Sequence, residues 1–471
     1  VGENADFEPD TQVTGLDFLI WQENIGATGA DIGDLGDADG SGLVDDTDLS
    51  IWELQYGRGG GLTSEAAGFI HSVGVPGSVN VISAPFHSDN ESIEIAGTND
   101  LTFASSATFT FNGSTGGGAT SSAALSVRKG ITVTMNGGIV VGDHDPNNDG
   151  TDLSLNSASR AKGDLIVNGV ISDANPSDPG ILGIGIPQNS LFFPLSTVTV
   201  NGNNTFTGQV RMGRTNLVLG HDNALGADLS DPNNPDYATF RQAGPANQFG
   251  YNLLSDNDSR TINNDITVAQ WQTFKGSNSL TLGGNITQTN NRGFINNIDS
   301  AKTLTLTGRL DIWEDDETGV DRMFQFDGTG TTRITGEIRD QPDDPNFGLP
   351  DVRRIVKTGT GVLVIDVDAG NNTHVGRTEV LMGNLHYADN DSLNTGGGLI
   401  VARGGAVGVV TGIAGNTTFN NAIDPNSTGG IMLAASEGAA SLDFTTSLSN
   451  AGRMTVAAPE TGLTFTGSIT P

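Results

Sequence analysis

A short phrase that recurs along this chain strongly limits what it can fold into. Three or four alternating β-forming residues are followed by a turn residue, a glycine, any residue and an aliphatic one. The glycines of five copies are Gly169, Gly284, Gly308, Gly336 and Gly467. The three central copies recur at intervals of about 25 residues, a length typical of one coil of a repeat protein. The alternation predicts short strands, and the spacing predicts that these strands stack as parallel rungs.

A longer phrase occurs twice, and every matching pair of residues has the same offset. Its first copy comprises Asn203-Asn204-Thr205, Gly208, Asn216-Leu217, Asp222-Asn223 and Leu225, and its second comprises Asn371-Asn372-Thr373, Gly376, Asn384-Leu385, Asn390-Asp391 and Leu393. The offset corresponds to about eight coils of 21 residues or seven of 24. We therefore predict that the two copies lie on equivalent, stacked rungs.

Composition excludes several classes of protein. The chain has 471 residues, of which 66 are glycine and none is cysteine, and its 55 acidic against 22 basic residues give a net charge of −33. This charge repels phosphate backbones, so no nucleic-acid partner is expected. No apolar run of about 18 residues is present, so no membrane-spanning helix is expected. The lack of cysteine excludes disulfides and thiolate metal sites.

The location of the protein is predicted from the same features. A glycine-rich chain with only 16% charged residues is typical of secreted all-β proteins. The chain begins with Val1 rather than methionine, which favours either a removed signal peptide or a fragment. We therefore expect an extracellular or cell-surface protein.

The first part of the chain contains a different, duplicated pattern. Asp17-Phe18-Leu19-Ile20-Trp21 returns as Asp48-Leu49-Ser50-Ile51-Trp52, and Gly26 returns at the same offset as Gly57. Oxygen-bearing side chains stand at alternate positions upstream of each copy. The apolar spacing after each run predicts short amphipathic helices over 17–24 and 48–55.

The oxygen-bearing residues have the spacing of a calcium loop, in which positions 1, 3, 5, 7 and 12 supply ligands to a cation that takes six or more oxygens. The candidate ligands of the second loop are Asp37, Asp39, Ser41, the carbonyl of Leu43 and Asp48, with Gly42 at the sharp turn and Asp45 acting through water; those of the first loop are Asp6, Glu8, Asp10, Gln12 and Asp17. Calcium is therefore the predicted cofactor. The alternative is that these acidic loops are solvated, or are relics of lost sites.

A third acidic stretch begins in the same way. Its candidate ligands are Asp145, Asn147, Asp149 and Thr151. It has Asn156 where the last ligand should stand, so a protruding polar loop is the alternative interpretation.

The duplicated N-terminal pattern resembles a type I dockerin, a module of two calcium loop-helix repeats that end in aspartate at loop position 12. The resemblance implies a cohesin partner. It also implies that the residues at loop positions 10 and 11, here Gly15-Leu16 and Asp46-Thr47, help to contact that partner.

The rest of the chain resembles the autotransporter-associated β-strand repeat of large secreted proteins. The best match is residues 356–365, followed by Asn371-Asn372-Thr373 and Gly376, and a weaker match is residues 198–208. The resemblance implies a right-handed parallel β-helix. The predicted fold is thus all-β, a right-handed parallel β-helix with a small N-terminal α-helical calcium-loop module.

The predicted domain boundaries follow from these patterns. They are a dockerin-like module over 1–58, a glycine-rich hinge over 59–64 and a β-helix domain over 65–471. Insertions rich in proline, aspartate and asparagine must leave the sheets as loops, because proline lacks a ladder donor. They lie at 173–179, 231–236, 340–350 and 424–426. Such insertions often carry binding in repeat proteins; the alternative is that they only solvate the surface.

No catalytic motif is recognisable. The basic group Arg353-Arg354 with Lys357 is the nearest match to the base of a polysaccharide lyase, but Lys357 is already explained by the strand repeat. The histidines have no metal-ligand spacing, and they are His71, His87, His144, His221, His374 and His386. Trp271 and Trp313 lie in predicted strands, and Trp313 is either a glycan-stacking residue or a partly buried strand residue. Enzymatic activity is therefore uncertain, and its absence is the favoured hypothesis.

Two functions follow from these predictions. The first is a secreted or cell-surface structural protein, a self-associating subunit of an extracellular filament or surface layer stabilised by calcium. In that case the partner is a second copy, bound end to end, or a cohesin-like protein. The second is a dockerin-bearing extracellular enzyme or adhesin that acts on or binds a polysaccharide.

Overall fold

The structure is a computed structural model of the whole chain, which falls into two compact units, Val1–Gly68 (unit 1) and Phe69–Pro471 (unit 2). The residues it describes are 5, 7, 15–29, 36–55, 68–72, 79–83, 86–89, 93–112, 123–128, 130–142, 153–155, 163–177, 179–185, 195–226, 240–242, 251–255, 258–312, 322–340, 353–368, 370–374, 376–388, 400–402, 406–411, 416–419, 430–435, 441–444, 448–449, 453–457, 464–465 and 469–470. The predicted hinge at 59–64 lies outside them.

Unit 1 contains two helices, α1 (Gly15–Asn24) and α2 (Asp46–Gln55). Both end at the predicted residue and begin two residues earlier than predicted. In α2 the reason is a cap, because the Asp45 carboxylate accepts the N–H of Thr47 at 2.7 Å. The aromatic rings pack between the helices: the Phe18 ring lies 5.7 Å from that of Trp21 and 4.9 Å from that of Trp52. Among the residues of this unit that the structure describes, the buried apolar ones are Ala5, Phe7, Trp21, Ala38, Val44 and Ile51.

The strands of unit 2 form long parallel sheets. The eleven-stranded sheet holds β1 (Gly68–Ser72), β4 (Ile93–Gly97), β7 (Ala123–Val127), β10 (Leu153–Leu155), β13 (Leu182–Ile184), β15 (Val210–Met212), β17 (Phe240–Gln242), β20 (Ile266–Val268), β23 (Ile286–Gln288), β26 (Leu310–Ile312) and β29 (Ile338–Asp340). The thirteen-stranded sheet holds β2 (Asn80–Ile82), β5 (Leu101–Phe103), β8 (Thr132–Met135), β11 (Asp164–Val167), β14 (Thr197–Val200), β16 (Thr215–Leu219), β18 (Tyr251–Ser255), β21 (Gln272–Gly276), β24 (Gly293–Ile298), β27 (Arg322–Gly328), β30 (Arg353–Lys357), β32 (Arg377–Val380) and β34 (Ile400–Ala402).

The remaining described strands belong to four further sheets. A nine-stranded sheet holds β19 (Arg260–Ile262), β22 (Leu280–Leu282), β25 (Thr303–Leu306), β28 (Thr331–Ile334), β31 (Val362–Ile365), β33 (Asn384–Tyr387), β35 (Ala406–Thr411), β37 (Gly430–Ala435) and β40 (Arg453–Ala457). A four-stranded sheet holds β3 (Phe86–Asp89), β6 (Phe109–Asn112), β9 (Ile139–Val141) and β12 (Ile171–Asp173). The two smallest sheets hold β36 (Asn416–Phe419), β38 (Ser441–Phe444) and β41 (Thr464–Phe465), and β39 (Leu448–Ser449) and β42 (Ile469–Thr470).

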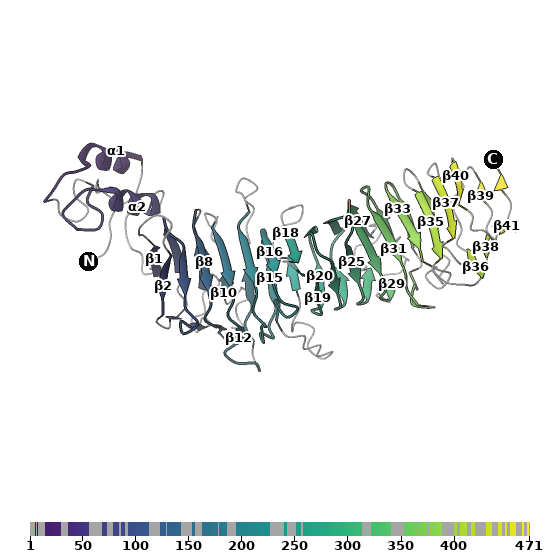
Figure 1. Cartoon of the computed structure of the whole chain (residues 1–471), viewed down its shortest axis with the longest axis horizontal. Coiled ribbons are helices and arrows are strands. Elements are labelled where there is room, and N and C mark those ends of the chain that lie inside the picture. Colours follow the sequence, from purple (N-terminus) through teal and green to yellow (C-terminus); the bar gives the residue numbers. More distant parts are fainter. Residues whose placement is uncertain are drawn as a thin grey trace, which may run out of the picture. The chain divides into compact units, whose positions relative to one another are not determined.

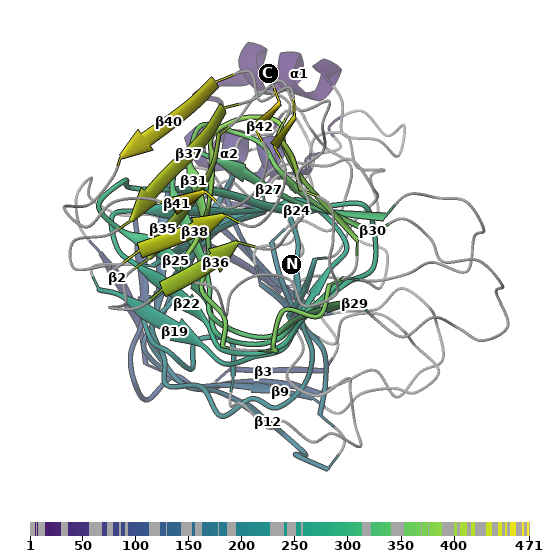
Figure 2. The ribbon, with the colours of Figure 1, turned by 90° about the vertical axis from the view of Figure 1, so that its right-hand side faces the viewer.

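The chain visits the large sheets in turn. β20, β21 and β22 lie in the eleven-, thirteen- and nine-stranded sheets, and each pairs in parallel with the strand three further along, β23, β24 and β25. Figure 1 shows the strands of unit 2 side by side in chain order, and Figure 2 shows β22, β24 and β29 on different sides of the stack. The prediction of a mostly β chain with stacked parallel strands is confirmed.

The core of unit 2 follows from the alternation of side chains along each strand. In the thirteen-stranded sheet, the aligned residues Leu165, Val198, Leu217 and Leu253 are each at most 1% exposed. Their polar neighbours, such as Thr197 and Thr199 on β14, are less buried. Because every rung adds apolar side chains to the same column, one continuous core runs through the stack.

The glycine of the short phrase lies at a corner where successive rungs approach closely. A Cβ at Gly169 would lie 1.8 Å from the carbonyl oxygen of Gly137, and one at Gly308 would lie 1.8 Å from that of Gly284. Only glycine permits this approach. At the first of these corners the residue before the glycine links the rungs, because the Asn168 amide donates to Asn136 Oδ1 at 2.8 Å.

The two copies of the longer phrase do not lie on equivalent rungs, so that prediction was wrong. Its Asn-Leu pair lies on β16 of the thirteen-stranded sheet in the first copy and on β33 of the nine-stranded sheet in the second. The reason is that coil length varies. Successive partners along one column of the nine-stranded sheet are unevenly spaced in the chain, and they are Leu280, Leu304, Thr332, Leu363 and Leu385. Two segments separated by a constant number of residues therefore need not lie on the same sheet.

The two copies do share a local contact. The N–H of Thr205 donates to the carbonyl of Ile171 at 3.0 Å, and that of Thr373 donates to the carbonyl of Ile338 at 2.9 Å. Each isoleucine ends a copy of the short phrase. The Asn-Asn-Thr segment that begins the long phrase therefore stacks on the preceding short phrase, on whichever sheet that phrase lies.

Candidate metal site

The second acidic loop is curled by hydrogen bonds from its own backbone to its aspartates. Asp37 accepts the N–H of Gly40 at 2.9 Å and that of Gly42 at 2.8 Å, one on each carboxylate oxygen. Asp39 accepts the N–H of Ser41 at 2.8 Å. Gly40 and Gly42 have φ of 71° and 79°, in the left-handed region that favours glycine. The glycine at the predicted sharp turn is thus required by the backbone.

Asp48 closes the loop from the first turn of α2. One of its carboxylate oxygens accepts the N–H of Ala38 at 2.7 Å and that of Asp39 at 3.2 Å. The other oxygen accepts the N–H of Asp45 at 2.8 Å. Because the Asp45 carboxylate accepts the N–H of Thr47, the two aspartates together cap the start of α2 in a variant of the capping box. Asp48 therefore joins the helix start to the beginning of the loop, a role that its spacing alone did not reveal.

The three aspartates bring their carboxylates together. An oxygen of each of Asp37, Asp39 and Asp48 lies within 4.8 Å of the others, and the side chains of Asp37 and Asp48 are fully buried. Burial raises the pKa of the Asp48 carboxyl, and hydrogen bonds from the backbone partly oppose this effect. Like charges at this separation and burial disfavour the ionised state unless a cation joins them.

The composition of unit 1 leaves no ordinary counter-charge for this cluster. Residues 1–68 contain fifteen acidic residues and a single basic one, Arg58. The donors of the loop are carboxylate, hydroxyl and carbonyl oxygens, the set that calcium prefers. Two further predicted ligands are neighbours, because the Ser41 hydroxyl donates to the Leu43 carbonyl at 3.1 Å. The residues present therefore fit a hard divalent cation.

The first acidic loop is described only in part. Asp6, Glu8, Asp10 and Gln12 lie outside the described residues. Asp17 is fully buried and accepts the N–H of Phe7 at 2.7 Å, as Asp48 accepts that of Ala38 at the same distance. The two bonds have the same span along the chain, so the duplicated sequence produces a duplicated contact. The third candidate stretch, with Asp145, Asn147, Asp149 and Thr151, also lies outside the described residues.

The second loop is tied to the end of α1 by bonds that sequence analysis did not predict. The N–H of Gly26 donates to the carbonyl of Val44 at 2.8 Å, and the N–H of Val44 donates to the carbonyl of Ala27 at 3.0 Å. The indole N–H of Trp21 donates to the carbonyl of Asp45 at 2.8 Å. The sequence repeats this tryptophan as Trp52, but the repeat by itself does not predict a hydrogen bond to the loop.

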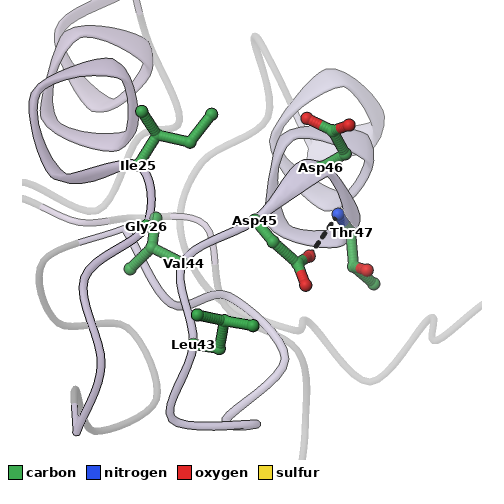
Figure 3. Close-up of a pocket in the computed structure, with 7 residues that line it drawn as sticks. All are labelled: Ile25, Gly26, Leu43, Val44, Asp45, Asp46 and Thr47. Carbon is green, nitrogen blue, oxygen red and sulfur yellow. Dashed lines mark hydrogen bonds between the residues drawn. The ribbon is translucent and has the colours of Figure 1, made fainter.

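A shallow pocket lies beside this connection. It is lined by Ile25, Gly26, Leu43, Val44, Asp45, Asp46 and Thr47. Figure 3 shows Ile25 beyond the end of one helix and Asp46 and Thr47 at the start of the other. The side chains of Ile25 and Leu43 are 54% and 40% exposed. This pocket combines exposed apolar side chains with Asp46-Thr47, which occupy loop positions 10 and 11.

The other predicted aromatic and basic groups lie in unit 2. Trp271 stands between β20 and β21 rather than in a strand and is half-buried, and Trp313 lies outside the described residues. Lys357 ends β30 with a buried side chain whose ammonium donates to the carbonyl of Gly359 at 2.9 Å. Burial lowers the pKa of Lys357 to about 8. Arg353 and Arg354 take part in ion pairs of unit 2 rather than in a free basic pair.

Comparison with known proteins finds no relative of this chain: no protein family, no curated protein and no solved structure matches it. Among the described residues, no helix is both long and apolar enough to cross a bilayer.

Proposed function

We propose that the protein is a calcium-stabilised structural subunit of an extracellular filament or surface layer. In this proposal unit 2 is a right-handed parallel β-helix and unit 1 is a dockerin-like module. The protein is secreted or displayed at the cell surface, and its partner is a second copy or a cohesin-like protein.

The β-helix part of the proposal is supported by the order of the strands. Every third strand over β17 to β31 returns to the same sheet, and the pairings are parallel. Crossover connections between parallel strands are right-handed in about 98% of cases, which supports the proposed hand. The corner glycines let consecutive rungs approach closely, as a coiled chain requires.

Self-association is supported by the edge strands that bound the sheets among the described residues, and this observation carries the proposal. A stack of parallel strands leaves backbone donors and acceptors unpaired at its first and last rungs. β2 is the first strand of the thirteen-stranded sheet in chain order, and Val81 on it is 63% exposed. An apolar edge strand of this kind pairs readily with another chain.

Calcium dependence is supported by the buried carboxylates of unit 1. Asp37 and Asp48 are fully buried in a unit whose only basic residue is Arg58. A bound cation would offset that charge and order the loop, so that unit 1 presents one surface to its partner.

Electron microscopy of the purified chain, with calcium and then with a chelator, tests the proposal. We expect filaments or sheets that dissolve on chelation. The Asp37→Asn/Asp48→Asn variant should fail to assemble, whereas Asp299→Asn, at an exposed turn of unit 2, should assemble as the unaltered chain does. Dispersed particles under all conditions would contradict self-assembly.

A second candidate function is favoured by the pocket beside the metal site. Exposed Ile25 and Leu43 next to Asp46-Thr47 fit a protein partner better than solvent. If this pocket docks a cohesin-like protein, the chain is a polysaccharide-binding adhesin or enzyme held in a larger assembly. Binding of a cohesin that is lost in Ile25→Asp but kept in Leu381→Asp, a comparably exposed apolar residue of unit 2, would support this function.

A further inference from the structure

Three buried carboxylates of unit 2 are each shared by two basic side chains. They come from the last strands of the eleven-stranded sheet and from the neighbouring strands of the thirteen-stranded sheet. We call this group the arginine cluster; its members are Arg309, Asp311, Arg339, Asp340, Arg353, Arg354, His374, Arg377 and Glu379. It holds five of the chain's 22 lysines and arginines.

The first carboxylate is Asp311 on β26. Arg309 Nε donates to both of its oxygens at 3.0 Å, and Arg339 Nε, on the next rung, donates to one of them at 2.5 Å. The Asp311 side chain is 4% exposed, whereas those of Arg309 and Arg339 are 33% and 36% exposed. One carboxylate therefore holds two guanidinium groups whose remaining N–H donors reach the surface.

The second shared carboxylate is Glu379 on β32. Arg377 lies 3.1 Å from it and Arg354 lies 3.5 Å from it, and Arg354 and Arg377 are paired residues on adjacent strands. The Glu379 side chain is 5% exposed, and those of the two arginines are 30% and 21% exposed. The arrangement of Asp311 is thus repeated on the neighbouring sheet.

The third shared carboxylate is Asp340, the last residue of β29. It follows Arg339 in the chain, lies 3.9 Å from Arg353, and accepts a hydrogen bond from His374 Nδ1 at 2.6 Å. The His374 ring is 1% exposed, and its Nε2 atom has no hydrogen-bond partner among the described residues. A buried polar atom without a protein partner indicates a place for a water molecule.

The electrostatics of the cluster differ from those of the rest of the chain. Five arginines face three shared carboxylates and the nearby Glu337, in a protein with a net charge of −33. The carboxylates and Arg353 are buried, whereas the side chains of Arg309, Arg339, Arg354 and Arg377 are partly exposed, so an approaching ligand meets these four arginines first. A guanidinium held on one edge by a carboxylate presents its other edge as a rigid fork that matches carboxylate or sulfate groups.

We propose that the arginine cluster is a binding site for an anionic polysaccharide, recognised through its carboxylate or sulfate groups. Two features favour a linear glycan over a protein. The exposed arginines lie on successive rungs, spaced about 4.8 Å apart, which suits charges repeated along a polymer. Protein interfaces have apolar centres, yet none of the exposed large apolar side chains among the described residues lies on β26, β29, β30 or β32; the nearest in the chain, Leu381 and Met382, follow the end of β32 opposite to Arg377.

Calorimetric titration of the full chain at physiological salt tests this proposal, which does not depend on the proposed assembly. The probes are short oligogalacturonates, which carry carboxylates, dextran sulfate, which carries sulfates, and neutral dextran. Arg309→Gln and Arg377→Gln should each weaken anionic glycan binding about tenfold, because each removes one charged donor. Each leaves a second arginine on the carboxylate, and thermal unfolding confirms that the variants fold.

The matched control is Arg333→Gln. It removes the same charge from an exposed ion pair with Asp366 on the nine-stranded sheet, and binding should change less than about twofold. Preference for oligogalacturonate or for dextran sulfate would identify carboxylate or sulfate as the recognised group. The proposal is overturned if neither anionic glycan binds more tightly than dextran, or if Arg333→Gln weakens binding as much as the cluster variants. Loss of self-association in the cluster variants without glycan binding would instead assign the cluster to a protein contact.

Discussion

In unit 2, buried carboxylates such as Asp311 and Glu379 are neutralised by arginines, whereas in unit 1 Asp37 and Asp48 are buried in a segment with fifteen acidic residues and one basic residue. The two units also differ in the extent of their apolar cores. The described core of unit 2 is one continuous cluster from Ile93 to Tyr387, and unit 1 buries six apolar residues among those described.

This difference teaches that the two units depend on different sources of stability. A stack of rungs supplies its own partners, because each new strand pairs its backbone and its apolar column with the strand before it. A small unit with a small core needs another contribution, and a metal ion is a common one. We therefore expect unit 1 to fold conditionally and unit 2 to fold without calcium.

Removal of calcium should have the largest effect, because it should destabilise unit 1 and leave the stability of unit 2 unchanged. Saturating calcium at about a thousand times its Kd stabilises a binding unit by about 4 kcal/mol, so chelation should unfold unit 1 and leave unit 2 intact. In a Trp271→Phe/Trp313→Phe chain, tryptophan fluorescence reports only on Trp21 and Trp52 of unit 1. The emission should shift to the red on chelation while the strand signal in circular dichroism stays constant. A simultaneous loss of both signals would contradict independent stability.

A pair of adjacent glycines tests how unit 2 is held together. A Cβ at Gly137 would lie 1.7 Å from the carbonyl oxygen of Ala107, so Gly137→Ala must push two rungs apart. We expect a loss of about 3 kcal/mol in the free energy of unfolding, measured by denaturant titration. At Gly138 the closest atom would be the Val170 carbonyl oxygen at 3.3 Å, so Gly138→Ala should cost less than about 1 kcal/mol. Equal effects would show that close rung contact is not what requires glycine here.

Substitution of the two aspartates in the first turn of α2 distinguishes the effect of a metal ligand from that of a surface charge. Asp48→Asn should weaken calcium binding about 100-fold, because it removes a charged ligand and weakens the loop closure through Ala38. Asp46→Asn changes the same charge at an exposed position of the same helix, and should change the affinity less than about threefold. Calcium titration calorimetry of both variants checks this. Similar losses in both would indicate general charge attraction rather than a coordinated ion.

The smallest expected effect is a pH dependence of the free energy of unfolding that comes from Lys357 in unit 2. Burial lowers its pKa from 10.5 to about 8, so between pH 8 and 10.5 the unfolded chain binds a proton that the folded chain does not. The free energy of unfolding should therefore rise with pH across this window, by on the order of 1 kcal/mol, as the cost of burying the charge is relieved. In Lys357→Met this rise should be absent when the two chains are compared at each pH. An unchanged rise would assign it to other groups.

Residue spacing was enough to predict which aspartates of the candidate site lie close together. The constant offset between the two copies indicated two equivalent loops, and Asp37, Asp39 and Asp48 do lie together. The capping box of Asp45 and Asp48 and the indole bond of Trp21 were not predictable, because each depends on the direction of a side chain in the folded loop. Calcium itself stays a prediction.

For unit 2, the sequence by itself determined the parallel stack, since a strand, a corner glycine and an aliphatic residue that recur at the length of one coil in the three central copies leave few other ways to bury the apolar column. Only the tertiary structure decided which sheet each phrase joins. The coil from Thr332 to Leu363 is longer than the next one, from Leu363 to Leu385, and such differences place equal phrases on different sheets. It also decided the arginine cluster, because Arg309 and Arg339 share Asp311, and Arg354 and Arg377 share Glu379, only when consecutive coils bring distant strands into register.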